Sequence, residues 1–177
     1  APADHLIMNE TSFVDIINTA IKQSEEQDCL VTLSIKPSRP DTGYGYIQFD
    51  PTTESFDDRI KNVKTFTEKP NLELAEQFLD SGDFYWNSGI FIWNLNAIQR
   101  EFKLHLPEIT ELFDEGVGKY NTTEEQVFID RIYEMCPSIS IDYGIMEKAD
   151  NVFTVLSDFG WSDLGTWGSM YTHIPHD

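Results

Sequence analysis

The sequence has few basic side chains. It holds 12 Lys and Arg against 31 Asp and Glu, which gives a formal net charge of −19 at pH 7. Nucleic acids and anionic membrane surfaces both attract proteins through a basic footprint, so we expect neither as a partner. An anionic small substrate fits this charge only where a divalent cation and a few lysines reverse the local field.

Long apolar runs and known phosphate loops are also missing. No apolar stretch approaches the roughly 18 residues of a membrane span, and no secretory signal is seen, so we expect a cytoplasmic protein. Neither GxGxxG nor a P-loop pattern occurs. The two cysteines, Cys29 and Cys136, lack CxxC spacing and are expected to be reduced, packed thiols. The four histidines show no ligand spacing, and no serine or cysteine has convincing triad partners, which argues against a hydrolytic nucleophile.

What the sequence does contain is an alternation of strand-like and helix-like segments. An apolar stripe predicts a helix up to Gln27 with Asn9 as its cap. Strands are expected at 29–35, 44–49, 62–67, 84–93 (broken at 87–89) and 152–156, and further helices at 72–81, 95–105, 107–116, 124–135, 141–147 and from about Thr166. This alternation predicts an α/β sheet with helical layers on both faces, in a single domain over 1–177.

The run from Trp161 to Trp167 sets one carboxylate, Asp163, between two large aromatics. A buried core rarely leaves an aspartate unpaired, so we expect Asp163 to meet a cation at the rim of an apolar pocket. Gly165 would let a ligand approach the backbone. The alternative is that Asp163 or Ser162 caps the helix that starts near Thr166.

Near the other end of the chain, Asp4 precedes His5. Together with Asp163 it forms a candidate Mg²⁺ site, because Mg²⁺ is typically held by one or two carboxylates with phosphates and waters. The alternative is an ordinary turn or cap aspartate.

Three further motifs suit a polar ligand. Gly45, in a Gly-Tyr-Gly-Tyr run, would expose backbone N–H groups. Lys69 would neutralise a phosphate while Glu68 accepts hydrogen bonds from hydroxyls, and Asn87 would point its amide at the ligand. Asp142 lies on a predicted short helix, which it could cap. The alternatives for the three motifs are an ordinary turn, an exposed ion pair at a strand end, and a plain β-bulge.

In their order along the chain, these runs resemble the mannose-1-phosphate guanylyltransferases, a branch of the sugar nucleotidyltransferases. The matching stretches are Pro2–His5, Thr42–Ile47, Phe66–Pro70, Trp86–Phe91, Ser140–Lys148 and Gly160–Trp167. The resemblance implies a Rossmann-like mixed α/β sheet flanked by helices, of the nucleotide-diphospho-sugar transferase type. The family's GTP-binding N-terminal part, with its glycine-rich loop, has no counterpart here. We therefore expect 1–177 to be a partial domain that carries the sugar-phosphate and metal portion.

The resemblance also implies a reaction, in which GTP and α-D-mannose 1-phosphate give GDP-mannose and pyrophosphate with Mg²⁺ as cofactor. Asp4 and Asp163 would hold the metal and Lys69 would grip the mannose phosphate, so that Lys69 and Asp163 are the expected catalytic residues. The expected substrate-binding set is Gly45, Glu68, Lys69, Asn87 and Asp142.

Two alternatives stay open at this point. One is a nucleotidyltransferase for another sugar 1-phosphate or another nucleotide, and the other is a non-catalytic regulatory relative that keeps the pocket. We expect the 177-residue piece alone to give no nucleotidyl transfer, and a homodimer is left open. Without the first strands of the family's sheet, a long unpaired edge is expected, which favours domain swapping.

Overall fold

The computed structural model describes residues 1–165 and 167–171. Its contacts divide the chain into two compact units, one formed by Ala1–Asn94 with the segment from Asn151 onward and the other by Leu95–Asp150. No linker marks either boundary in the sequence, so this division was not predicted. That 1–177 forms a single partial domain stays a prediction.

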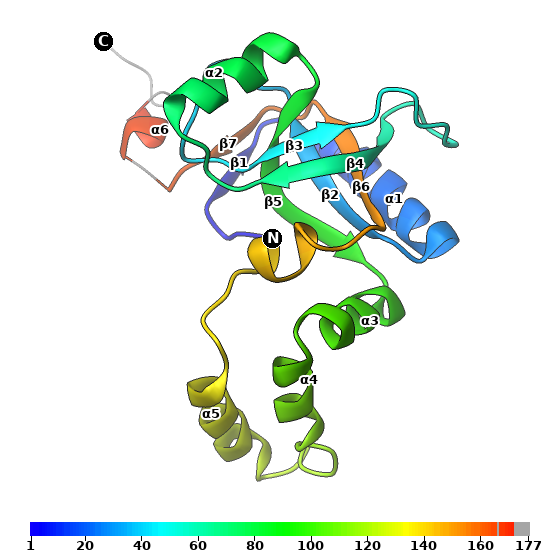
Figure 1. Cartoon of the computed structure of the whole chain (residues 1–177), viewed down its shortest axis with the longest axis vertical. Coiled ribbons are helices and arrows are strands. Elements are labelled where there is room, and N and C mark those ends of the chain that lie inside the picture. Colours follow the sequence, from blue (N-terminus) through cyan, green and yellow to red (C-terminus); the bar gives the residue numbers. More distant parts are fainter. Residues whose placement is uncertain (166, 172–177) are drawn as a thin grey trace. The chain divides into compact units, whose positions relative to one another are not determined.

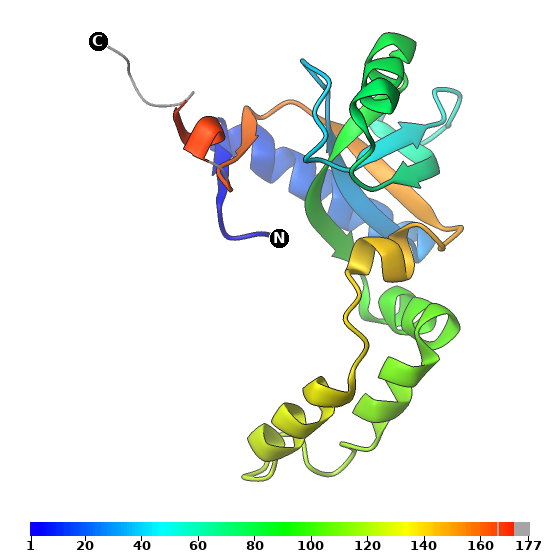
Figure 2. The ribbon, with the colours of Figure 1, turned by 60° about the vertical axis from the view of Figure 1, so that its left-hand side comes forward.

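The first unit is built on five strands that pair in a closed ring (Figures 1 and 2). The ring order is β2-β5-β3-β4-β6, in which only β2 and β6 run parallel. The strands span Leu30–Ile35 (β2), Tyr46–Phe49 (β3), Ile60–Thr67 (β4), Phe84–Trp93 (β5) and Val152–Ser157 (β6). The expected strands and the mixed α/β class are confirmed. The expected long open edge is wrong for the described residues, because β6 pairs with both β2 and β4 and closes the ring.

A second, two-stranded sheet joins the two ends of this unit. The strands β1 (His5–Ile7) and β7 (Trp161–Asp163) pair antiparallel and lie side by side in Figure 1. Neither was predicted, because three residues are too few to show a period of two.

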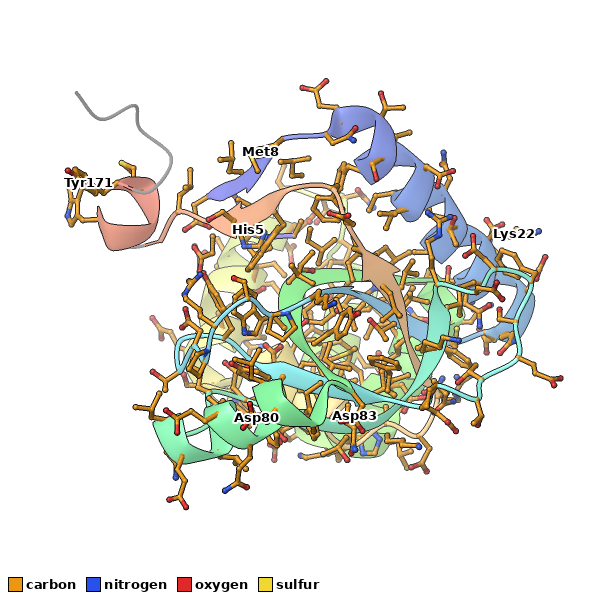
Figure 3. The ribbon with its side chains drawn as sticks, turned by 90° about the horizontal axis from the view of Figure 1, so that it is seen from above. His5, Met8, Lys22, Asp80, Asp83 and Tyr171 are labelled. Carbon is orange, nitrogen blue, oxygen red and sulfur yellow. The ribbon has the colours of Figure 1, made fainter. Side chains whose placement is uncertain are left out.

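Helix α1 (Glu10–Gln27) covers the ring on the side of β5 and β6. The Asn9 side chain accepts a hydrogen bond from the Ser12 backbone N–H at 3.0 Å, as expected of the cap. The buried residues Ile16 and Ala20 pack into an apolar core with residues of the ring strands. Figure 3, which looks down on the structure, labels Lys22 on this helix.

Helix α2 (Leu72–Ser81) covers part of β5 and carries Asp80, labelled in Figure 3. The Asn71 side chain caps it by accepting from the Leu74 N–H at 2.9 Å, and Gly82 ends it, as predicted. Ala75 of this helix lies in an aromatic cluster with Tyr46, Phe84 and Trp86.

The predicted break of the strand 84–93 at 87–89 is wrong, since β5 runs through these residues. A bulge takes the place of the break: its register against β2 shifts between Thr32 and Ser34, and Gly89 has φ +70°, a conformation that favours glycine. The Ser88 hydroxyl stays inside the sheet and donates to the Leu33 carbonyl at 2.7 Å.

The second unit is helical. It contains α3 (Leu95–His105), α4 (Pro107–Asp114), α5 (Glu125–Met135) and a π-helical turn, η1 (Asp142–Met146). The helices expected here are confirmed within two residues at their ends, although 141–147 was not expected to be π-helical. In the first unit, the last helix, α6, covers Trp167–Tyr171, while its predicted start at Thr166 lies outside the described residues. None of the described helices combines the length and apolar character that a membrane crossing needs.

Candidate active site

The β1–β7 ladder brings the two acidic motifs together. In its register His5 stands opposite Asp163, and the Leu164 N–H donates to the Asp4 carbonyl at 3.0 Å just beyond it. One ligand atom each from Asp4, His5 and Asp163 lies within 4.8 Å of the other two. The structure thus brings together the two aspartates predicted as metal ligands. Their role in binding a metal stays a prediction.

A tight turn holds the Asp163 carboxylate. Its Oδ1 accepts from the Gly165 N–H at 2.6 Å. A Cβ atom at position 165 would lie 2.8 Å from this oxygen and 3.5 Å from Asp4 Oδ2, closer to the first than side chains tolerate. A larger residue at 165 would therefore require the Asp163 carboxylate to shift. This turn precedes α6. The alternative, in which Asp163 or Ser162 caps a helix that starts near Thr166, involves a residue outside the described ones.

His5 is the member of this cluster that the sequence reasoning missed. Its Nδ1 accepts from the indole N–H of Trp161 at 3.1 Å, and the two rings meet edge to face with centroids 5.2 Å apart. Burial lowers the pKa of His5, although the carboxylates of Asp163 and Asp4 act in the opposite direction. The one sequence feature that could have identified His5 as a member of the cluster is its position directly after Asp4.

The residues predicted to bind the sugar phosphate gather where β3, β4 and β5 lie side by side. Gly45 precedes β3, Glu68 follows β4, and Asn87 lies on β5. The Asn87 N–H donates to the Gly45 carbonyl at 2.8 Å. A Cβ at position 45 would lie 2.6 Å from Glu68 Oε2 and 3.5 Å from the Asn87 Cβ. The structure therefore brings these three together, and a side chain at 45 would require the Glu68 carboxylate to move.

The side-chain oxygen of Asn87 is engaged within the sheet. It accepts from the Thr32 hydroxyl at 3.0 Å and from the Gly89 N–H at 3.1 Å. Asn87 is buried. This oxygen stabilises the bulge, which is the alternative interpretation of the motif, and a role of Asn87 toward a ligand stays a prediction.

Glu68 and Lys69 form an ion pair with a separation of 3.2 Å. The Glu68 side chain is 12% exposed and that of Lys69 is 60% exposed, so the carboxylate faces inward while the ammonium group reaches solvent. Lys69 has φ +45°, which is uncommon for a residue with a side chain and is often found at functional sites. Asp142 is the first residue of η1 in the second unit, and a role in binding substrate stays a prediction.

Three aromatic side chains connect the two groups of polar residues within the first unit. Tyr44 makes edge contacts with Trp86, 5.1 Å between centroids, and with Trp161, 5.3 Å. Trp86 precedes Asn87, and Trp161 is the strand partner of Ile7 and the hydrogen-bond partner of His5. Burial raises the pKa of Tyr44, and the negative charge of Asp163 adds to this effect. The three rings form an apolar wall that links the acidic cluster to the group of Gly45, Glu68 and Asn87.

The sequence reasoning also missed one cation beside this wall. The Arg39 guanidinium lies over the Trp86 ring at 5.2 Å and pairs with the Asp41 carboxylate at 2.7 Å. It comes from the proline-rich loop before β3, which composition marks only as a loop.

Comparison with known proteins shows which family the chain resembles. The profile described as "Nucleotidyl transferase" matches residues 1–177. Two relatives named mannose-1-phosphate guanylyltransferase, one from Escherichia coli and one from its strain K12, are 37% and 34% identical over 96% and 98% of this chain. The chain spans 37% of the length of each of these relatives.

A solved structure from Thermus thermophilus, titled mannose-1-phosphate geranyltransferase, superposes with a TM-score of 0.82. It is 31% identical, and the match covers 99% of this chain and 50% of that one. The expected fold type, a mixed sheet flanked by helices, is confirmed by this match. The chain belongs to the nucleotidyl transferase family.

Proposed function

We propose that the protein containing this chain transfers a guanylyl group from GTP to α-D-mannose 1-phosphate, giving GDP-mannose and pyrophosphate. The observation that carries the proposal is the meeting of Asp4 and Asp163 from opposite ends of the chain, within 4.8 Å at their ligand atoms. The names of the relatives, mannose-1-phosphate guanylyltransferase, support the choice of sugar and nucleotide.

The donor set of the cluster fits the proposed cofactor. Mg²⁺ prefers oxygen ligands and usually takes only one or two carboxylates from a protein, with phosphates and waters completing its shell. Asp4 is exposed and Asp163 half-buried, so both carboxylates can be reached by a phosphate. Bound there, Mg²⁺ would neutralise phosphate charge that a protein of net charge −19 otherwise repels.

The residues of the chain itself would bind and orient the sugar phosphate. The exposed ammonium group of Lys69 suits a phosphate oxygen, and the inward-facing carboxylate of Glu68 suits sugar hydroxyls. Gly45 would let the ring approach the backbone, and Asn87 completes the proposed set in the first unit. A role of Asp142, on η1 of the second unit, stays a separate prediction. Positioning of this kind is the main contribution of a protein to phosphoryl transfer.

In the proposed reaction, an oxygen of the sugar phosphate forms a bond to the α-phosphorus of GTP. The bond from that phosphorus to the bridging oxygen of the β-phosphate breaks, and pyrophosphate leaves with the electron pair. The aromatic wall of Tyr44, Trp86 and Trp161 would exclude water from one side of the reacting groups.

A substrate panel tests the proposal. The protein that contains this chain is assayed for pyrophosphate release with GTP, ATP or UTP and with mannose 1-phosphate or glucose 1-phosphate. We expect release to be fastest with GTP and mannose 1-phosphate. A faster pair would identify another nucleotidyltransferase, and no release with any pair would identify a non-catalytic relative.

Two minor predictions belong with this proposal. A cytoplasmic location fits Cys29 and Cys136, which are both free thiols, as expected. Cys29 is buried as predicted, whereas Cys136 is only partly buried. A homodimer stays a prediction that light scattering tests directly.

A further inference from the structure

The hydrogen bond between Trp161 and His5 fixes where His5 carries its proton. The indole nitrogen of Trp161 can only donate, and it donates to His5 Nδ1 at 3.1 Å. Nδ1 must therefore present a lone pair, and the single hydrogen of the neutral imidazole is on Nε2.

Neither ring nitrogen of His5 then has a lone pair to offer a metal ion. The lone pair of Nδ1 is used by Trp161, and Nε2 bears the hydrogen. The conclusion is the same whichever nitrogen lies within 4.8 Å of the carboxylate oxygens of Asp4 and Asp163. The only polar hydrogen of the neutral His5 ring is then the one on Nε2.

We propose that Trp161 holds His5 in its Nε2–H tautomer beside the Asp4–Asp163 pair, so that the site presents two carboxylates and no nitrogen ligand. His5 is then a positioning residue, and Trp161 determines metal specificity. This inference rests on the proposed metal-dependent function. An all-oxygen donor set suits Mg²⁺, whereas a histidine nitrogen added to two carboxylates suits Zn²⁺.

The surroundings of the two rings keep this arrangement in place. The ladder sets His5 directly opposite Asp163, with Trp161 two residues earlier on the same strand. The Trp161 ring also contacts Tyr44, with centroids 5.3 Å apart. Figure 3 shows the labelled His5 side chain beside β7. Rotation of either ring would break the hydrogen bond and disturb this packing.

The protonation state can be measured without a metal. Long-range ¹H–¹⁵N spectra of the chain with ¹⁵N-labelled histidine distinguish the two tautomers, and the His5→Gln variant assigns the His5 signals. We expect the Nε2–H tautomer, and we expect saturation with Mg²⁺ to leave it in place. An Nδ1–H tautomer, or a ¹⁵N shift typical of direct coordination, would overturn the inference.

Trp161→Phe tests the specificity claim, since it removes the donor and keeps an aromatic ring. Trp167→Phe is the matched control, because Trp167 is 85% exposed on α6. In calorimetric titrations we expect Trp161→Phe to bind Zn²⁺ about tenfold more tightly and Mg²⁺ within about twofold of the unsubstituted chain. Unchanged Zn²⁺ affinity in a folded Trp161→Phe variant would contradict the claim.

The two proposals fail in different ways. Absence of Mg²⁺ binding by the unsubstituted chain would count against the proposed function. The tautomer spectrum decides on its own whether Trp161 fixes the proton of His5 on Nε2, including the case in which Trp161→Phe does not fold.

Discussion

Replacing Asp163 by Asn separates the charge of this residue from its structural role. The Asn side-chain oxygen can still accept from the Gly165 N–H, so the turn that now holds this contact at 2.6 Å is kept. What changes is the charge of the Asp4–Asp163 pair, which falls from two negative charges to one. We therefore expect the free energy of unfolding to stay within about 0.5 kcal/mol of the unsubstituted protein.

The loss in metal affinity follows from Coulomb's law. Two unit charges about 4 Å apart interact by about 1 kcal/mol in water, so a divalent ion loses about 2 kcal/mol with one carboxylate. The value for water applies because Asp4 is exposed and Asp163 half-buried. At about 1.36 kcal/mol per factor of ten, the expected loss of Mg²⁺ affinity is about 30-fold.

Calorimetric titration with Mg²⁺ measures this loss, and Asp158→Asn is its matched control. A protein with a formal charge of −19 attracts any divalent ion through its overall field, and both variants remove one negative charge. Asp158 is exposed in the loop between β6 and β7, outside the Asp4–His5–Asp163 cluster. Equal effects of the two substitutions, or none from Asp163→Asn, would refute the assignment of Asp163 as a ligand. A transfer assay on the same pair should show lost turnover in Asp163→Asn alone.

Three further substitutions test other parts of the structure. Gly45→Ala should raise the KM for the sugar phosphate about tenfold, because the new Cβ would lie 2.6 Å from Glu68 Oε2 and displace that carboxylate. Asn71→Ala should lower the free energy of unfolding by about 1 kcal/mol in urea titrations, through loss of the α2 cap. The hydrogen bond from Arg59 lowers the pKa of Asp57 in the folded state. The pair therefore stabilises the fold fully above the pKa that Asp57 has in the unfolded chain, and this stabilisation is lost as the pH falls through its pKa in the folded state. Arg59→Gln should reduce the dependence of the free energy of unfolding on pH in this acidic range.

Each of these has an outcome that contradicts it. An unchanged KM in Gly45→Ala would mean that Glu68 does not contact the sugar phosphate. An Asn71→Ser variant should keep most of the stability that Asn71→Ala loses, because serine also caps helices; equal losses would point away from the cap. An acid-side slope that is the same with and without Arg59 would exclude the ion pair as its source.

Local residue patterns determined the secondary elements with enough length to show a period. The 18-residue α1 carries its cap and its apolar stripe within its own sequence, as does α2. The strands β2 and β6 are short, largely buried runs in which apolar residues predominate. These signals depend on neighbours a few residues apart, which is why the sequence predicted them.

Motif composition, together with the family resemblance, also selected the residues that the first unit brings together at its two polar clusters. A carboxylate between two tryptophans, as at Asp163, is not expected in an apolar core or in a solvated loop. An adjacent acid and base at the end of a strand, as at Glu68, is likewise not explained by burial or by exposure alone. Such conflicts between local preference and environment are common at functional sites. Asp142 shows the limit of this reasoning, since a motif says which residue is unusual and does not say which unit carries it.

The amino-acid order alone decided the α/β class, the capped helices and the acidic character that calls for a cation. Only the tertiary structure decided that β6 closes the ring, that β1 meets β7, and that His5 turns a lone pair toward Trp161. These are contacts between segments far apart in the chain. Their partners are chosen by the packing of the whole unit, and no local period in the sequence records that choice.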